Sequence, residues 1–284
     1  MGKRLDTRHK GLDAYAHLAK VFGDTPWLHY GLWEPGENVS FPNLRAAQER
    51  YVERLMALLP PAPARVLDIG GGTGELALRL IEAGYQVDML TPSEVQADMA
   101  REKLGDRARV FTTTFQGFTE PGPYDVCLFS ESFQYIPLED AFAGIGRVLA
   151  PRGHVVIADC FRTEAYRGGR EPGGGHRYSA FEAGAEQAGY RFLANEDVTE
   201  MAAQTMALDQ KFYRELVSPL LGQINEDLEA RRPIVHAFMW LGIKLFMPKS
   251  ERENFAARMK ADYRSPERFK AVTSYRFVSL SRTG

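Results

Sequence analysis

Short apolar runs alternate with amphipathic segments through the middle of the chain. Residues 66–69 hold three apolar residues around one acid, a pattern typical of a short buried strand, and a helical run starts at Leu76. Repetition of this order predicts βαβ units, and hence an α/β fold with a parallel sheet covered by helices on both faces. Further strands are expected at 85–90, 109–114, 124–130, 153–158 and 190–198. One helix should begin at Ser93, which forms a capping box with Gln96. Two more helices are expected, one at 138–149 and one that ends at Gly189.

The flanking segments have helical patterns. Residues 1–60 are expected to form an N-terminal helical lid, with one helix around Leu12–Phe22 and another at Leu44–Leu59. Between the two helices, residues 27–36 hold two Trp, a His and a Tyr inside a loop bounded by Gly and Pro. This loop either covers a ligand or docks its aromatic rings on the core.

A long insertion separates the sixth strand from the C-terminal segment. Residues 199–272 are too long for a simple connector and predict a helical cap insertion, with a dimerisation arm as the alternative. The main domain then comprises residues 61–198 and 273–284. Within the insertion, residues 233–248 are apolar on nearly all sides, so a helix here must be buried, paired with another subunit or laid on lipid. We hypothesise that it lines a pocket for a hydrophobic acceptor through Trp240. The glycine-rich residues 168–175 predict a mobile loop.

The turn after the first strand carries the clearest chemical signal. Its spacing is Asp68-x-Gly70-x-Gly72-x-Gly74, directly before a helix. Glycine allows φ > 0 and lets a ligand approach the backbone N–H groups. A dinucleotide fingerprint would need a third glycine where Glu75 stands, which argues against a nicotinamide oxidoreductase.

This spacing resembles the first motif of the class I S-adenosylmethionine-dependent methyltransferases. Residues 147–159 resemble the R-x-L-x-P-G-G strand signature of that family, with Arg152 in place of the first glycine. The His29–Trp33 segment resembles the branch that contains tocopherol, sarcosine and cyclopropane-forming methyltransferases. The resemblance implies a Rossmann-like, seven-stranded, mostly parallel sheet that closes with an antiparallel strand, here 275–281. It also implies S-adenosylmethionine as the cofactor.

The resemblance assigns the cofactor contacts. Asp68 would lie near the ammonium group of the cofactor, and the three glycines along its methionine part. Thr91 and Ser93 stand where many members place an acid for the ribose, and Gln116 where an acid would reach the adenine amine. The full set of expected cofactor residues is Asp68, Gly70, Gly72, Gly74, Thr91, Ser93, Gln116 and Ser130.

Candidate catalytic groups lie in two segments, the residues after the fourth strand and the aromatic loop at 27–36. Glu131 follows the fourth strand among aromatic residues and is our first candidate for a general base, followed by His29 and Tyr30. A structural role for each remains the alternative. Tyr135, His176, Tyr178 and Trp240 are expected to line the acceptor pocket. No group of residues has metal-ligand spacing, so no metal is predicted.

Composition restricts the partners. The formal net charge of −2 gives no reason to expect nucleic acid, and no apolar stretch is long enough for a membrane span. The two cysteines, Cys127 and Cys160, are isolated, and no signal peptide is apparent, which fits a cytoplasmic protein. A homodimer is expected if the helical insertion serves as a dimerisation arm. The predicted function is methylation (O-, C- or N-) of a small, hydrophobic metabolite or natural product. The alternatives are other chemistry with the same cofactor, such as cyclopropane formation, and a non-catalytic cofactor-binding protein.

Overall fold

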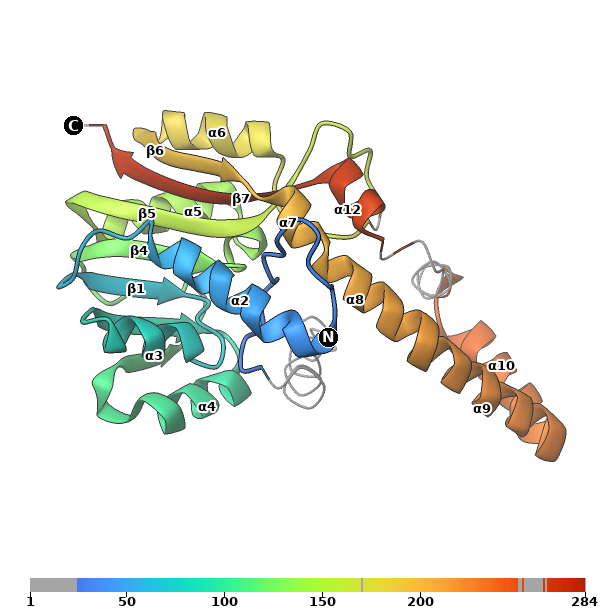
Figure 1. Ribbon diagram of the computed structural model, residues 1–284. Helices are drawn as coiled ribbons and strands as arrows, with labels where there is room; N and C mark the ends of the chain where they lie inside the picture. The colour runs from blue at the N-terminus through green and yellow to red at the C-terminus, as the bar shows by residue number, and fades with distance from the viewer. Residues whose placement is uncertain (1–24, 170, 250–251, 253–262, 264, 284) are drawn as a thin grey trace.

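A computed structural model gives the fold of the chain (Figure 1). It describes all residues except 1–24, 170, 250–251, 253–262, 264 and 284. The helix expected around Leu12–Phe22 therefore lies outside the described residues.

The centre of the molecule is a seven-stranded sheet with the order β3-β2-β1-β4-β5-β7-β6. Strands β1 to β5 pair in parallel, and β7 inserts antiparallel between β5 and β6. The predicted Rossmann-like sheet with an antiparallel last strand is thus confirmed. The strands are β1 (Arg65–Ile69), β2 (Gln86–Thr91), β3 (Arg109–Thr112), β4 (Tyr124–Ser130), β5 (Leu149–Arg162), β6 (Tyr190–Asp197) and β7 (Thr273–Arg282).

Helices cover both faces of the sheet (Figure 1). Alternate residues of a strand point to opposite faces, so Val66 belongs to one core layer and Leu67 to the other. The first layer is covered by α2 (Phe41–Met56), α3 (Glu75–Glu82), α4 (Glu94–Leu104) and α7 (Thr199–Ala203), and the second by α5 (Leu138–Val148) and α6 (Tyr178–Gln187).

The fifth strand is longer than its apolar run predicts. Its pairing with β4 ends at Ala158, but its pairing with β7 continues to Arg162. The antiparallel neighbour therefore extends the strand beyond the edge where the parallel strands stop. The third strand is shorter than expected, since its ladder with β2 ends at Thr112.

Residues 171–175 of the glycine-rich segment, which the sequence predicts to be mobile, are held against the sheet. The Arg162 guanidinium, which is 8% exposed, donates hydrogen bonds to the carbonyl oxygens of Glu171, Pro172 and Gly173 at 2.8–3.1 Å. Gly175 has a φ of +88° and lies so close to the carbonyl of Cys160 that a Cβ would clash. Glycine at this position therefore allows the backbone to pack closely against β5 as well as to adopt a positive φ.

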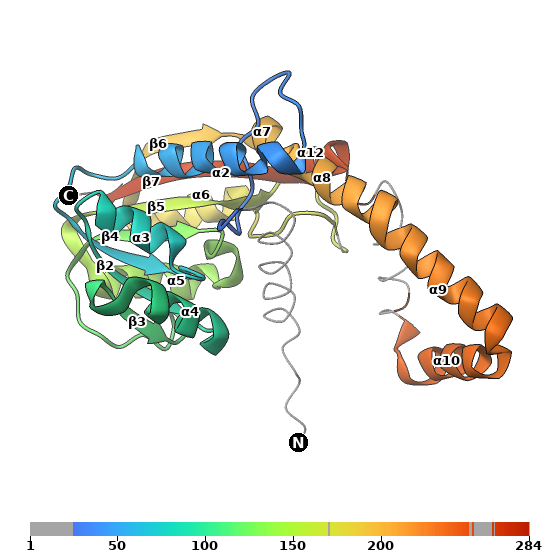
Figure 2. The same ribbon diagram turned by 60° about the horizontal axis from the view of Figure 1, so that its bottom comes forward.

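The insertion between β6 and β7 projects from the body as an arm (Figures 1 and 2). Helix α8 (Thr205–Phe212) continues through a π-helical turn (Tyr213–Val217) into α9 (Ser218–Arg231), and α10 (Pro233–Phe246) folds back along α9. Helix α12 (Pro266–Val272) then leads into β7. Helices α9 and α10 extend away from the sheet.

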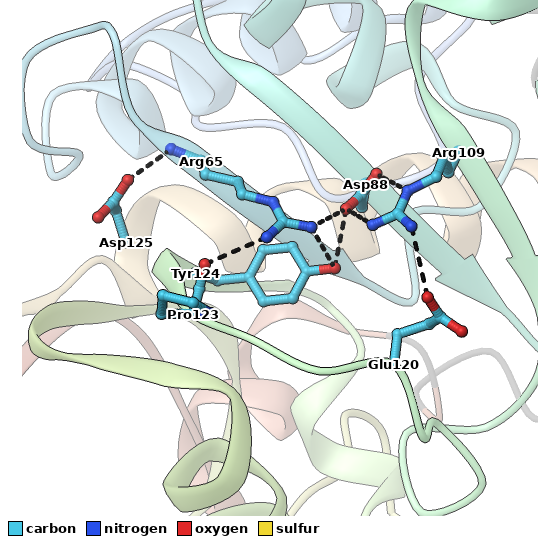
Figure 3. A network of polar contacts seen from close by, with 7 residues as sticks. All are labelled: Arg65, Asp88, Arg109, Glu120, Pro123, Tyr124 and Asp125. Atoms are coloured by element: carbon cyan, nitrogen blue, oxygen red, sulfur yellow. Dashed lines mark hydrogen bonds and ion pairs between the residues drawn. The ribbon is translucent and has the colours of Figure 1, made fainter.

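The opposite, amino-terminal edge of the sheet is held by a polar network (Figure 3). The Asp88 carboxylate accepts hydrogen bonds from Arg65 (3.0 Å), Arg109 (2.6 and 2.9 Å) and the Tyr124 hydroxyl (2.8 Å). These residues come from β1 to β4, so one buried acid joins four strands. Burial raises the pKa of Asp88, but its three donors outweigh burial and hold that pKa below the ordinary value.

We expect Asp88→Asn to lower the free energy of unfolding by about 2 kcal/mol, because charge-assisted hydrogen bonds are lost from a mostly buried carboxylate. Since the pKa of Asp88 is lowered in the folded state, its stabilising contribution should be present above pH ~4 and lost as the pH falls further. Urea unfolding at pH 7 and pH 3 measures both effects. Glu120→Gln, which removes an exposed ion pair with Arg109, is the control and should cost less than about 0.5 kcal/mol. Equal losses in the two variants would contradict the role given to Asp88.

Candidate active site

A pocket of about 360 Å³ opens at the carboxyl ends of the parallel strands, where α/β sheets place their ligands. The glycine turn after β1 forms its floor. The ends of β2 and β4 and the loop after β3 form its sides, and residues 26–29 of the N-terminal loop cover it. Of the residues predicted for the site, those that line this pocket are His29, Asp68, Gly70, Gly72, Thr91, Gln116, Ser130, Glu131 and Tyr135.

Asp68 is the most unusual group in the pocket wall. Its side chain is fully buried, and within the described part of the chain neither carboxylate oxygen has a hydrogen-bond partner. Burial raises the pKa of Asp68 to about 7. A buried carboxylate without a partner is costly, so this position favours a cationic ligand that would pair with it.

The glycine turn leaves space beside that carboxylate. Gly70 and Gly72 have φ values of +84° and +58°, which side chains other than glycine rarely adopt. Among the residues described, a Cβ on Gly72 would meet only Leu28, at 3.9 Å across the pocket. Gly74 is different: it begins α3 and packs against Ala100 of α4, so it serves helix packing and does not line the pocket.

The loop over the pocket is held in place by α2. The fully buried Gln48 amide donates to the carbonyl oxygens of His29 (2.6 Å) and Trp27 (3.3 Å) and accepts from the Thr25 hydroxyl (2.7 Å). No sequence pattern indicates this role for Gln48 beyond its place on an amphipathic helix. Of the predicted N-terminal lid, the loop faces the pocket, whereas α2 packs on the sheet through Tyr51.

Glu131 joins the loop to the last strand. Its Oε1 accepts hydrogen bonds from the Tyr30 backbone N–H (2.7 Å) and from the Tyr275 hydroxyl (2.6 Å). Its φ of +54° is unusual for a residue with a side chain and marks a position held by its surroundings. Burial raises the pKa of Glu131 to about 7, although the two donors partly oppose that shift. A carboxyl with this pKa is suited to accept a proton near neutral pH.

His29 lies against Tyr51, with ring centroids 4.0 Å apart. Its Nδ1 is 2.9 Å from the Tyr30 carbonyl oxygen, which can only accept, so Nδ1 carries the proton and Nε2 the lone pair. Nε2 is buried with no hydrogen-bond partner among the residues described. Burial lowers the pKa of His29 to about 4, which leaves the ring neutral at pH 7 and a weaker base than Glu131.

The side of the pocket formed by the end of β2 and the loop after β3 carries neutral polar groups. The Thr91 hydroxyl donates to Gln96 Oε1 (3.1 Å), which leaves the amide nitrogen of Gln96 as a donor on the pocket wall. The sequence indicates Gln96 only through its capping box with Ser93. Ser93 itself caps α4 by accepting from the Gln96 backbone N–H and does not line the pocket. Gln116 lines the pocket with its amide nitrogen 3.4 Å from Asp140.

Besides Gly74 and Ser93, four more of the predicted residues do not line the pocket. The Tyr30 ring packs on Phe269 and Tyr275, and its backbone N–H donates to Glu131. His176 is bonded to the Ile136 carbonyl (2.8 Å), and the Tyr178 ring lies under Arg276. Trp240 is half-exposed on the arm. His176, Tyr178 and Trp240 therefore do not line this pocket.

A seven-stranded sheet with this strand order, a glycine turn after β1 and a pocket above it define the class I methyltransferase fold. Residues 66–153 match the methyltransferase domain family. The predicted resemblance to methyltransferases is confirmed for this part of the chain.

Individual proteins are similar to the chain in sequence or in fold. An uncharacterized methyltransferase of Geobacillus kaustophilus is 37% identical over 123 residues, which cover 41% of this chain and 57% of that protein. The chain spans about half the length of the curated relatives it matches first. The geranyl diphosphate C-methyltransferase of Streptomyces coelicolor, solved with S-adenosyl-L-homocysteine, superposes with a TM-score of 0.66 at 14% identity over 100% of both chains. The 4+2 cyclase SpnF gives 0.66 at 19% identity, over 96% of this chain and 94% of its own.

No helix among the described residues is both long enough and apolar enough to cross a membrane. Within the same residues, no group of three or more His, Cys, Asp or Glu side chains could hold a metal ion. Cys127 and Cys160 are free and buried.

We expect Gly72→Val to weaken binding of S-adenosylmethionine at least ~30-fold, because the branched side chain would project into open pocket space beside Asp68. The valine also costs about 1–2 kcal/mol of backbone strain at positive φ. Gly36→Val is the matched control, since Gly36 also has a positive φ (+81°) but no atom within 4 Å and no place in the pocket. Calorimetric titration of both folded variants measures the difference, and near-normal affinity of Gly72→Val would remove the turn from the cofactor site.

Proposed function

We propose that the chain transfers a methyl group from S-adenosylmethionine to a small, largely apolar acceptor. The observation that carries the proposal is the buried, unpartnered carboxylate of Asp68 beside a glycine turn with open space, both among the residues the structure describes. The cofactor carries an ammonium group that would pair with this carboxylate and a thin methionine chain that would pass over the glycines. When bound, it supplies a methyl group on a positively charged sulfur.

The remaining polar groups of the pocket suit the rest of the cofactor. The Gln96 amide nitrogen, oriented by the Thr91 hydroxyl, would donate to a ribose hydroxyl in place of the acid that many members have. The Gln116 amide would contact the adenine amine through its oxygen, because its nitrogen faces Asp140. Ser130 is held by the Tyr51 hydroxyl (2.9 Å) and lines the wall between these groups and Glu131.

The acceptor would bind between the N-terminal loop and the residues after β4. Leu28, Tyr135 and Ile136 give this side of the pocket an apolar surface, which supports a hydrophobic acceptor. Glu131 would take the proton of an acceptor hydroxyl, amine or acidic carbon, and His29 Nε2 would accept a hydrogen bond that orients the acceptor. The Tyr275 hydroxyl and the Tyr30 N–H fix Glu131 through one oxygen.

Two experiments test the proposal in sequence. Titration calorimetry with S-adenosylmethionine and S-adenosylhomocysteine tests the cofactor site, and absence of binding to both would refute the proposal. Incubation of a metabolite extract with methyl-labelled cofactor then shows which compound gains the label, and mass spectrometry of that product distinguishes an added methyl from a new cyclopropane ring. Cofactor binding without any labelled product would favour a non-catalytic binding protein.

The cytoplasmic location and the homodimer predicted from the sequence remain part of this proposal. Light scattering of the purified chain measures its mass and tests the homodimer directly.

A further inference from the structure

Helix α10 presents a continuous apolar face to solvent. Ile234, Phe238, Leu241 and Leu245 are spaced by four, three and four residues, so they lie on one side of the helix. Their exposed fractions are 71%, 70%, 49% and 67%. An exposed stripe of large apolar residues on this scale indicates a surface that contacts something else.

The opposite side of α10 contacts α9. His236 Nε2 lies 3.0 Å from the Asn225 side-chain oxygen, and the Trp240 indole N–H is 2.9 Å from His236 and 3.3 Å from that oxygen. Met239 and Ile243, on the same side, are partly buried. The hairpin thus fixes the orientation of α10 and turns its apolar stripe outward, away from α9.

Neither helix of the hairpin contains a buried residue among those the structure describes. A helix of 14 residues is marginally stable in water unless an apolar face is buried. The arm would therefore gain stability from a surface that covers the α10 stripe.

Charge indicates the nature of that surface. From residue 230 to 249 the chain has four basic residues, Arg231, Arg232, Lys244 and Lys249, and no acidic residue. Asp227 on α9 lies 3.7 Å from Arg231. A second copy of α10 packed on the first would bring basic residues against basic residues in either orientation, because this segment has no acid to offer. An anionic surface with an apolar interior complements both features.

Helix α9 lacks this combination. Leu220, Leu221 and Ile224 are exposed on it, at 52%, 42% and 48%. However, Glu226, Asp227 and Glu229 follow in the same helix, and acids are repelled by anionic headgroups. The contact surface is therefore the α10 face and its basic flanks.

We propose that α10 is an interfacial membrane-binding helix that lies flat on an anionic phospholipid bilayer. Its apolar stripe enters the boundary between headgroups and acyl chains, and the flanking arginines and lysines contact the headgroup phosphates. At 14 residues it is too short to span the bilayer. The arm holds this contact away from the sheet (Figure 2), so the proposal does not depend on the methyl acceptor.

Flotation of the full chain with vesicles tests the proposal. We expect it to float with vesicles of phosphatidylcholine and phosphatidylglycerol at about 7:3, and at least ~tenfold less with pure phosphatidylcholine. Binding should fall several-fold when salt is raised from about 0.1 to about 0.5 M, since the electrostatic contribution is screened. Absence of binding to the anionic vesicles would overturn the proposal.

Variants locate the contact. Leu241→Gln and Leu193→Gln form a matched pair, because both leucines are 49% exposed but Leu193 lies on β6. We expect Leu241→Gln to reduce vesicle binding at least ~fivefold and Leu193→Gln to leave it unchanged. Lys244→Glu should reduce it by a similar factor, whereas Lys211→Glu on α8 should not. Equal effects within either pair would overturn the assignment to α10.

Trp240 provides a direct reporter. Trp27 and Trp33 are 6% and 1% exposed, whereas Trp240 is 50% exposed. A blue shift of tryptophan emission on adding anionic vesicles, abolished in Trp240→Phe, is the expected result. If instead Leu241→Gln converts a dimer into monomers and vesicles bind nothing, the α10 face is an interface between copies and the proposal is wrong.

Discussion

Asp68→Asn is expected to weaken S-adenosylmethionine binding at least ~100-fold while making the free protein more stable at pH ~8. The carboxylate is fully buried and lacks a hydrogen-bond partner in the described part of the chain. An asparagine cannot pair with the ammonium group of the cofactor through opposite charge. Loss of one partner from a buried ion pair typically costs about 3–5 kcal/mol, which corresponds to a factor of about 100 or more.

Asp68→Asn is expected to raise the free energy of unfolding although it weakens cofactor binding, because without the cofactor the charged carboxylate is buried with no partner among the described residues. Burial raises the pKa of Asp68 from its ordinary 3.8 to about 7. Between these values the unfolded chain has released the proton and the folded chain still holds it, so stability falls as the pH rises from about 4 to about 7. The full difference is on the order of 4 kcal/mol above pH ~7. The asparagine substitution removes this pH dependence, although the amide that it buries offsets part of the gain.

Urea unfolding at about pH 5 and pH 8, with calorimetry of cofactor binding, checks both parts. Asp159→Asn is the control: Asp159 is equally buried, but its oxygens accept from the backbone N–H groups of Gln134 (3.0 Å) and Cys160 (2.7 Å), and it does not line the pocket. The affinity of this control for the cofactor should stay within about threefold of normal. Equal loss of binding in both variants would show that Asp68 acts through the fold.

Glu131→Gln is expected to lower kcat by about 100-fold or more, with a cofactor affinity within about threefold of the unchanged protein. The glutamine keeps a side-chain oxygen that can accept from Tyr30 N–H and from the Tyr275 hydroxyl, so the loop should stay in place. It cannot take up a proton at neutral pH. The substitution therefore separates proton transfer from positioning.

The pH profile gives an independent check. Burial raises the pKa of Glu131 to about 7, so the rate should increase with pH up to about 7 and level off above it. Glu131→Gln should abolish this limb of the profile. Glu200→Gln, which removes an exposed ion pair between α7 and Lys270 of α12, should retain both rate and profile. If kcat holds in Glu131→Gln and only cofactor affinity falls, Glu131 belongs to the cofactor site.

The sheet and the glycine turn could be predicted because they depend on local patterns. Apolar runs identified the first six strands, the family resemblance supplied the seventh, and the spacing from Asp68 to Gly74 identified the turn. The partners of these residues could not be predicted in the same way. Gln48 contacts His29 across 19 residues and Tyr275 contacts Glu131 across 144, and nothing in their neighbours distinguishes them from core residues.

The position of α10 could not be predicted from the sequence for a different reason. An apolar helix requires a covering surface, but periodicity does not say whether that surface is the same domain, another chain or lipid. The pattern in residues 233–248 predicts a wall for the acceptor, whereas the hairpin carries it away from the pocket. Similarly, His176 and Tyr178 follow a glycine-rich loop near the ligand edge, but their side chains turn to Ile136 and Arg276.

The position of β7 has a consequence for the order in which the protein forms during translation. β7 lies between β5 and β6, so β6 joins the sheet only after residues 273–282 have left the ribosome. Until then β5 is an open edge that can pair with other chains. Tyr275, in the same strand, also supplies the hydroxyl that holds Glu131. A nascent chain can thus complete the glycine turn before β7 is made, whereas the carboxylate of Glu131 is secured only once Tyr275 of β7 has been synthesised.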